Sequence, residues 1–202
     1  MSRSQRQPAT EARILLPDVE ARRGAASPED PAMLAMTDFW LVPMRTTSPH
    51  TSIEDALQSM KVSGVRFLFV VDAGGVPVGS VTSFDIQGER PLRHMMSIGC
   101  TESTCAWRDV LVRDVMDPVD DWRVVDIEDL ALWRLGDLPA AMRAPDRGYL
   151  VVVERWDQGT AEGTAMRVRG LVSPTTVRQL IGDEAWNTAC FPVAYSRDSR
   201  GH

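Results

Sequence analysis

Apolar residues change from helical to strand-like spacing between residues 53 and 81. Over 53–60 they recur at i, i+3, i+4 and i+7, which predicts an amphipathic helix. A nearly continuous apolar run follows at 65–71, as is typical of a strand buried on both faces. The turn-forming sequence at 72–75 and the apolar run at 76–81 predict an antiparallel partner for that strand. The pattern therefore indicates a helix followed by a β-hairpin.

Helix boundaries are also visible in the sequence. Thr51 and Glu54 have the spacing of a capping box, which predicts the start of the first helix. Near the other end of the chain, Ser173 is suited to an N-cap, Pro174 to the first helical position, and Gly182 to the C-terminal cap.

This pattern of elements occurs twice, so the chain contains an internal repeat. Each copy ends in a glycine followed by a hydroxyl residue that opens a helix, as in Gly79–Asp85 and Gly170–Thr176. The matching segments are 52–57 with 126–131, 65–72 with 149–154, and 79–85 with 170–176. The second copy carries two insertions, one that lengthens its helix over 132–143 and one in a polar loop at 156–163.

The repeat divides the chain into five parts. Residues 1–36 are rich in Arg, Ala, Pro and acidic residues, and we expect a loosely ordered arm. The remaining parts are the first repeat at 37–88, a linker at 89–112, the second repeat at 113–183 and a C-terminal tail at 184–202. Within the linker, residues 91–96 are predicted to be helical.

Composition excludes several classes of function. The chain has 202 residues, 44% of them hydrophobic and 25% charged, and a formal net charge of −6. This acidic balance argues against nucleic acid as a partner, because phosphate-backbone binding depends on clustered Lys and Arg. No apolar run approaches the roughly 20 residues of a membrane-spanning helix, so no membrane insertion is expected. The first residues lack the apolar core of a signal peptide, and we expect a cytoplasmic protein.

The chemistry-bearing residues do not indicate an enzyme or a metal site. Cys100, Cys105 and Cys190 are an odd set without the spacing of a zinc site, and we expect free thiols. The three histidines are far apart in the sequence and have no ligand-like neighbours. No nucleophile elbow, Walker loop or dinucleotide-binding glycine fingerprint is present. We therefore expect no catalytic residues, no metal and no catalytic cofactor.

The repeated elements resemble the CBS domain, a family named for cystathionine β-synthase whose members occur as tandem pairs called Bateman modules. The resemblance covers roughly residues 38–182 and includes the Val-Pro segment at 41–43, the Ser-Ile-Glu-Asp-Ala-Leu helix and the Gly-x-x-Thr-x-x-Asp motif ending at Asp85. It implies a stand-alone α/β (α+β) protein in which two βαββα repeats pack about a pseudo-twofold axis, with sheets sandwiched by helices.

The resemblance also implies a nucleotide site in a cleft between the repeats. Asp85 corresponds to the family's ribose acceptor, and Thr82 to the residue that contacts phosphate or ribose. The first turn of the helix that follows offers free N–H groups to an anion. The other residues implied are Met44, Arg45, Val65, Arg66, Phe67 and Ser83.

Structural interpretations of these residues remain open. Thr82 and Asp85 have the spacing of a capping box, which stabilises a helix without any ligand. Met44 and Phe67 are apolar and are equally suited to core packing. Arg66 is equally suited to solvent or to an ion pair.

The second repeat departs from the family pattern. Thr176 stands where the family has its aspartate, three residues after Ser173. A hydroxyl cannot accept both ribose hydroxyls as a carboxylate does. We therefore expect one competent nucleotide site per chain and a weaker second cleft at Ser173 and Thr176.

The function implied by the resemblance is a non-enzymatic regulatory module. It would form a homodimer, sense AMP, ADP or ATP as an adenosine ligand, and signal the bound state to a regulated partner protein. The alternative is a ligand-free dimerisation or scaffold protein that keeps the fold without sensing.

Overall fold

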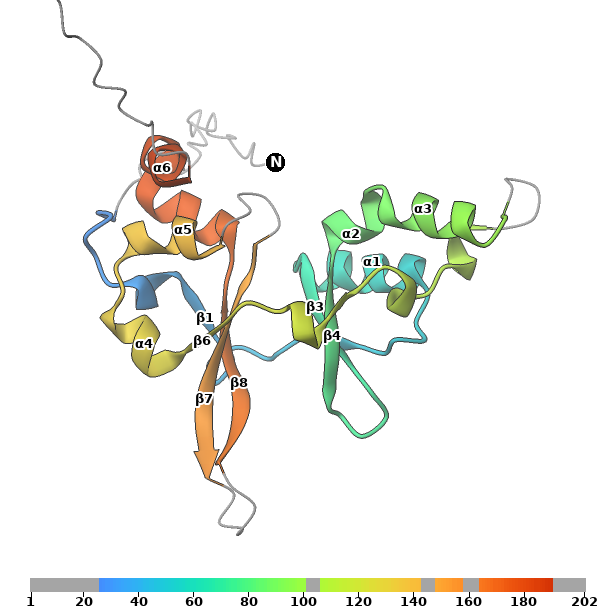
Figure 1. The fold of residues 1–202 in the computed structure, drawn as a ribbon, viewed down its shortest axis with the longest axis horizontal. Helices are drawn as coiled ribbons and strands as arrows, with labels where there is room; N and C mark the ends of the chain where they lie inside the picture. The colour runs from blue at the N-terminus through green and yellow to red at the C-terminus, as the bar shows by residue number, and fades with distance from the viewer. Residues whose placement is uncertain (1–25, 101–105, 143–147, 158–163, 191–202) are drawn as a thin grey trace, which may run out of the picture.

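The computed structural model describes residues 26–100, 106–142, 148–157 and 164–190. They form two lobes, each built on a four-stranded sheet that carries helices (Figure 1). This mixed α/β architecture with two sheets confirms the fold class predicted from the sequence.

The first sheet has the strand order β2-β3-β4-β5. Its strands are β2 (Thr46–Thr47), β3 (Phe67–Val71), β4 (Pro77–Thr82) and β5 (Asp117–Pro118). The helices of this lobe are α1 (Ile53–Ser63), α2 (Ser83–Gln87) and α3 (Arg90–Ser97), followed by the short 3-10 turns η3 (Trp107–Asp109) and η4 (Val112–Asp114). The helix expected in the linker is therefore present as α3.

The second sheet has the strand order β1-β8-β7-β6. Its strands are β1 (Met36–Asp38), β6 (Val124–Asp126), β7 (Leu150–Asp157) and β8 (Thr164–Val172). The helices of this lobe are α4 (Ile127–Leu132), α5 (Leu138–Met142) and α6 (Pro174–Cys190), with 3-10 turns η2 (Ala32–Ala35) and η6 (Leu135–Asp137). A further 3-10 turn, η5 (Val119–Asp121), joins β5 to β6.

The two repeats exchange their first strands. Strand β1 precedes the first repeat's helix but pairs antiparallel with β8 of the second repeat. Strand β5 precedes the second repeat's helix but pairs antiparallel with β4 of the first repeat. Each sheet is thus completed by a strand from the other repeat, and the two lobes are connected through both sheets.

The exchange brings backbones very close together at the two motif glycines. A Cβ on Gly79 would lie 2.5 Å from the carbonyl oxygen of Asp117, and a Cβ on Gly170 would lie 2.8 Å from that of Thr37. Real Cβ atoms do not approach other atoms this closely, so both positions require glycine for space.

Aromatic side chains fill the contact between the two sheets. Phe67 and Phe69 of β3 pack with Tyr149 and Trp122 of the second lobe, at ring-centroid distances of 4.8 Å for Phe67–Tyr149 and 5.4 Å for Phe69–Trp122. Val151 of β7 belongs to the same buried cluster. A separate apolar core lies beneath the helices of each lobe.

Two helix boundaries differ from those predicted. Helix α1 is capped by Ser52, whose hydroxyl accepts a hydrogen bond from the backbone N–H of Asp55 at 3.0 Å, so the predicted cap at Thr51 is wrong by one residue. The prediction that the helix of the second repeat is lengthened over 132–143 is also wrong, because α4 ends at Leu132 and α5 is a separate helix. The break lies at Trp133 and Arg134, whose backbones are extended, and Pro139 stands in the first turn of α5, where its missing N–H leaves no helical hydrogen bond unmade.

The flanking segments contribute to the second core. Residues 26–36, assigned to the arm, bury Ala32 and Ala35, whereas residues 1–25 lie outside the described part of the chain. Helix α6 bends at Gly182, where φ is 82°, and then continues to Cys190 within the segment assigned to the tail. Trp186 on this continuation is fully buried.

Cys100 is disulfide-bonded, so the prediction of a free thiol is wrong for this residue. That prediction rested on the presumed compartment and on sequence spacing, neither of which reports which sulfur atoms the fold brings together. Within the part of the chain described here, no helix is long and apolar enough to span a membrane. Among the same residues, no group of three or more His, Cys, Asp or Glu side chains could hold a metal ion.

The close approach of strands β4 and β5 predicts that Gly79→Ala destabilises the protein. Because the new Cβ would meet the backbone of β5, we expect the free energy of unfolding to fall by about 1–3 kcal/mol. Gly74→Ala in the exposed turn is the matched control and should change it by no more than about 0.5 kcal/mol. Urea unfolding of the three proteins measures the difference, and equal stability of the two variants would contradict the close approach.

Candidate functional site

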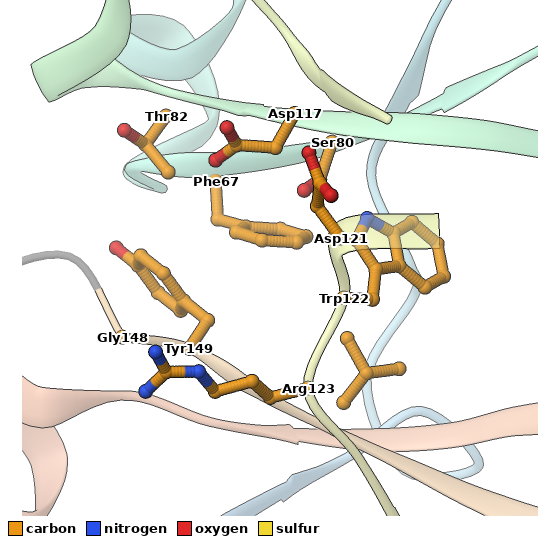
Figure 2. A pocket seen from close by; sticks show the side chains of 10 residues that line it. Phe67, Ser80, Thr82, Asp117, Asp121, Trp122, Arg123, Gly148 and Tyr149 are labelled. Carbon is orange, nitrogen blue, oxygen red and sulfur yellow. The ribbon is translucent and has the colours of Figure 1, made fainter. Parts of the chain in front are cut away.

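Two cavities lie on either side of an aromatic pair between the lobes. Phe67 and Tyr149 line both, and their ring centroids are 4.8 Å apart. The larger cavity has a volume of about 520 Å³ and the smaller one about 160 Å³. The smaller cavity is shown in Figure 2.

The larger cavity combines a slot of the first repeat with the end of the second. Its other lining residues are Thr37, Phe39, Val42, Pro43, Arg45, Ser63, Gly64, Val65, Arg66, Phe69, Leu171, Ser173 and Thr175. The slot consists of the segment before β2 and the α1–β3 connection, and β8 and the start of α6 face it.

The larger cavity is electropositive. Arg45 and Arg66 line it, and neither makes an ion pair with any residue that the structure describes. No carboxylate is among its lining residues in the described chain. Since the whole chain has a net charge of −6, two uncompensated arginines in one cavity are a local exception. The lining favours an anionic ligand with an apolar or aromatic body.

The start of α6 borders this cavity and is capped by its own side chains. The Ser173 hydroxyl accepts a hydrogen bond from the backbone N–H of Thr176 at 3.1 Å, and the two hydroxyls are 2.8 Å apart. Ser173 and Thr175 line the cavity, whereas the hydroxyl of Thr176 is engaged with Ser173.

The smaller cavity lies beside the motif of the first repeat. Its lining adds Ser80, Thr82, Asp117, Asp121, Trp122, Arg123, Gly148 and Val151 to the shared aromatic pair (Figure 2). Thr82 and Asp85 form a capping box at the start of α2. The Thr82 hydroxyl donates to Asp85 Oδ2 at 2.6 Å, and the Thr82 backbone N–H donates to the same oxygen at 2.9 Å. Thr82 and Asp85 therefore cap α2, which is the structural role that the sequence left open for them.

Arg90 occupies the remaining oxygen of Asp85. Its Nη1 lies 3.3 Å from Asp85 Oδ1 and donates to the carbonyl of Val115 at 2.8 Å, while its Nη2 lies 2.6 Å from Asp117 Oδ1. The Asp85 side chain is only 3% exposed. Both carboxylate oxygens therefore have partners from the protein itself.

The structure divides the predicted nucleotide residues between the two cavities. Arg45, Val65 and Arg66 line the larger one together with Ser173 of the predicted second cleft. Thr82 lines the smaller one, with Asp85 buried behind it.

The remaining predicted residues are placed as follows. Phe67 lines both cavities, and Met44 is 37% exposed and lines neither. The backbone N–H of Ser83 donates to the carbonyl of Arg66 at 3.0 Å. The strand exchange explains why the predicted residues lie in two cavities, because it places the slot of each repeat opposite the glycine motif of the other repeat.

Sequence reasoning missed several lining residues. Tyr149, which separates the cavities, begins the segment of the second repeat that matches 65–72. Assigning a ligand-binding slot to this segment as well as to 65–67 would have identified it. Asp117 likewise matches the Val-Pro segment of the first copy. Arg90 has no counterpart in the motif, and nothing in the sequence connects it with Asp85.

The tyrosine between the cavities has a perturbed pKa. Burial raises the pKa of Tyr149 above its ordinary value of 10.0, the positive charge of Arg66 lowers it, and the negative charge of Asp85 raises it. The phenol therefore stays protonated and neutral in the neutral pH range.

Comparison with known proteins identifies the first repeat. A family model of the CBS domain matches residues 36–90, and the resemblance seen in the sequence is confirmed there. No curated protein shows significant similarity to the chain.

Solved structures of CBS-domain proteins match most of the chain at low similarity. CBSX2 from Arabidopsis thaliana is 22% identical, with 73% of this chain and 91% of that chain covered and a TM-score of 0.45. CBS domain protein TA0289 from Thermoplasma acidophilum is 17% identical, with 76% and 74% covered and a TM-score of 0.49. CBSX2 has also been solved in complex with AMP, and that structure is 20% identical, with 73% and 93% covered and a TM-score of 0.44. At these identities and TM-scores, the ligands and partners of the solved proteins are not transferred to this chain.

The buried capping box predicts the effect of Asp85→Ala. The change leaves the backbone N–H and hydroxyl of Thr82 without their acceptor, so we expect the free energy of unfolding to fall by about 1–3 kcal/mol. Asp137→Ala is the control, because exposed Asp137 accepts a similar bond from Arg134 at 2.8 Å, and it should cost about 1 kcal/mol or less. Denaturant unfolding that gave Asp85→Ala the smaller loss would contradict this role.

The perturbed pKa of Tyr149 predicts a dependence of stability on alkaline pH. The unfolded chain loses this phenolic proton near pH 10, while the folded chain retains it to higher pH. The contribution to stability is therefore complete below pH 10 and is lost as the pH rises through the folded-state pKa. Urea unfolding from about pH 8 to about pH 11 should show a decline that is shallower in Tyr149→Phe. Parallel pH profiles for the two proteins would contradict the assignment.

Proposed function

We propose that the chain is a non-catalytic regulatory module that binds an adenine nucleotide in the larger cavity. The observation that carries this proposal is the pair of uncompensated arginines, Arg45 and Arg66, in an otherwise mostly apolar cavity between the repeats. Such a cavity offers an apolar enclosure for a base and positive charge for a phosphate.

The size of the larger cavity supports a nucleotide as the ligand. Its volume of about 520 Å³ lies within the range of roughly 300–1,000 Å³ that is typical of small-molecule sites. Val42, Val65 and Phe67 supply apolar surface on which a flat base can pack.

The charge of the cavity supports an anionic group on that ligand. Arginine presents its N–H donors in a planar fork that matches phosphate oxygens. The start of α6 adds partial positive charge beside Ser173 and Thr175, since the first N–H groups of a helix favour anions. Phosphate bound between these groups would not require the aspartate that Thr176 replaces.

The ribose role of Asp85 stays a prediction. In this protein both oxygens of the carboxylate are bound, one by Thr82 and the other by Arg90. Acceptance of ribose hydroxyls by Asp85 would first require Arg90 to release it.

Signalling to a regulated partner and formation of a homodimer are parts of the same proposal, as is cytoplasmic location. The bound nucleotide would contact both repeats and so fix the slot of the first against α6 of the second, which a partner could sense. Cys100 is disulfide-bonded, and disulfides are uncommon in cytosolic proteins. The redox state of Cys100 in cells would therefore test the proposed cytoplasmic location.

The alternative is a ligand-free scaffold. The ion pairs of Arg90 with Asp85 and Asp117 favour it for the smaller cavity, because they join α3, α2 and β5 without any ligand. If the larger cavity is also empty under all conditions, the module only holds its partners together.

Nucleotide titration tests the proposal. By isothermal titration calorimetry, we expect AMP, ADP or ATP to bind at one nucleotide per chain. Arg66→Ala should weaken binding about 10- to 100-fold, because charge-assisted hydrogen bonds are worth about 1.5–3 kcal/mol. Arg45→Ala should have a similar effect.

The control for these variants is Arg108→Ala. Arg108 is exposed, makes no ion pair with a described residue and lines neither cavity, so its removal should leave the affinity unchanged. Absence of heat with all three nucleotides would reject the proposal and favour the scaffold. Equal losses in all three arginine variants would show that only general charge matters.

A further inference from the structure

A third cavity lies next to the larger one, along helix α6. Its volume is about 350 Å³, and its lining consists of Thr175, Arg178, Gln179, Gly182 and Asp183. Thr175 also lines the larger cavity, so the two cavities meet at the first turn of this helix. We call the third cavity the α6 cavity. A ligand that leaves the larger cavity past Thr175 would enter it.

The α6 cavity is formed by one face of the helix and by the bend in it. Counted from Thr175, the lining residues up to Gly182 follow at i+3, i+4 and i+7, which places them on the same face. The opposite face carries Val177 and Ile181, which are buried in the core of the second lobe. At Gly182 the helix changes direction (Figure 1). The cavity lies in this bend.

Arg178 supplies positive charge to the α6 cavity. Its guanidinium carbon lies 5.3 Å from the centre of the buried Trp186 ring, which helps to hold it in place. Its Nε lies 3.5 Å from Oδ1 of Asp183, whose side chain is 68% exposed. Ion pairs this exposed are weak, because water and salt screen them. A multiply charged anion can therefore compete with Asp183 for the guanidinium of Arg178.

We propose that the α6 cavity holds the outer phosphates of a nucleotide whose base lies in the larger cavity, and that Arg178 makes the site prefer ATP to AMP. The inference rests on the function proposed above and specifies its ligand. The first phosphate lies beside Arg66 or Ser173, and the chain of phosphates continues past Thr175. Arg178 follows Thr175 by about 4.5 Å along the helix axis, at roughly 1.5 Å per residue.

The chemistry of the two cavities sets the direction of the nucleotide. All the side chains that line the α6 cavity are polar, so it offers no apolar surface to a base, whereas Val65 and Phe67 offer such a surface in the larger cavity. A free anion at Arg178 would have the Asp183 carboxylate beside it. A phosphate that belongs to a nucleotide already bound arrives at high effective concentration, which compensates for that repulsion.

Comparison of ATP with AMP tests the role of Arg178. Both nucleotides are titrated into the full chain by calorimetry in buffer without divalent metal ions. In the wild type we expect ATP to bind about tenfold more tightly than AMP, because arginine forms charge-assisted hydrogen bonds with phosphate. Arg178→Gln should lower the affinity for ATP to about that for AMP. Its affinity for AMP should equal that of the wild type, which also shows that the variant is folded.

Two further variants separate Arg178 from the general charge of the protein. Asp183→Asn removes the competing carboxylate, so it should raise the affinity for ATP about two- to fivefold and leave that for AMP unchanged. Arg134→Gln is the matched control, because Arg134 is exposed in the same lobe and lines neither cavity. It loses the same charge as Arg178→Gln and should keep the wild-type preference for ATP.

The outcomes distinguish this inference from the proposed function. Equal affinities for ATP and AMP in the wild type would overturn the inference and leave the proposed function intact. The same would hold if Arg178→Gln weakened both nucleotides equally, or if Arg134→Gln lost the preference for ATP as fully as Arg178→Gln. Absence of binding by both nucleotides would instead reject the proposed function, and this inference with it.

Discussion

The exchange of strands β1 and β5 holds the two repeats together. Each short strand completes the sheet of the other repeat, and the backbones meet so closely at Gly79 and Gly170 that a Cβ would collide with the opposing chain. Because the exchange is reciprocal, the two sheets cannot separate without breaking strand pairs in both. The aromatic cluster of Phe67, Phe69 and Tyr149 then fills the contact between them. Each cavity therefore takes its walls from both repeats, and a ligand in either one would contact both.

The same topology builds two unlike cavities because the side chains at equivalent positions differ. On one side the slot residues include Arg45 and Arg66, with no carboxylate among the described lining. On the other side the equivalent segment supplies Asp117 and Asp121, and Arg90 binds the motif aspartate internally. The charged residues that line the larger cavity are thus both arginines, whereas Arg123 accompanies the two carboxylates in the smaller one. The two cavities therefore differ in charge as well as in size.

Much of the fold could be predicted, because it is encoded in local patterns that occur twice. The helical spacing over 53–60, the apolar run before the hairpin and the glycine at each motif all describe single elements. The exchange of β1 and β5 could not be predicted, since strands of two or three residues carry no periodicity that identifies their partner. The nucleotide residues were assigned to one site for the same reason, because the sequence places Arg66 and Asp85 in one repeat while the fold sends them to different cavities. Arg90 was missed because its ion pair with Asp85 joins neighbouring helices by geometry alone.

We propose that the larger cavity, and not the motif of Asp85, holds the nucleotide. A crystal structure of the full chain with AMP tests it most directly. We expect density for the base beside Val65 and Phe67, with phosphate beside Arg66 or Ser173, while Arg90 still bridges Asp85 and Asp117. Density in the smaller cavity, with Asp85 on the ribose hydroxyls and Arg90 displaced, would contradict it.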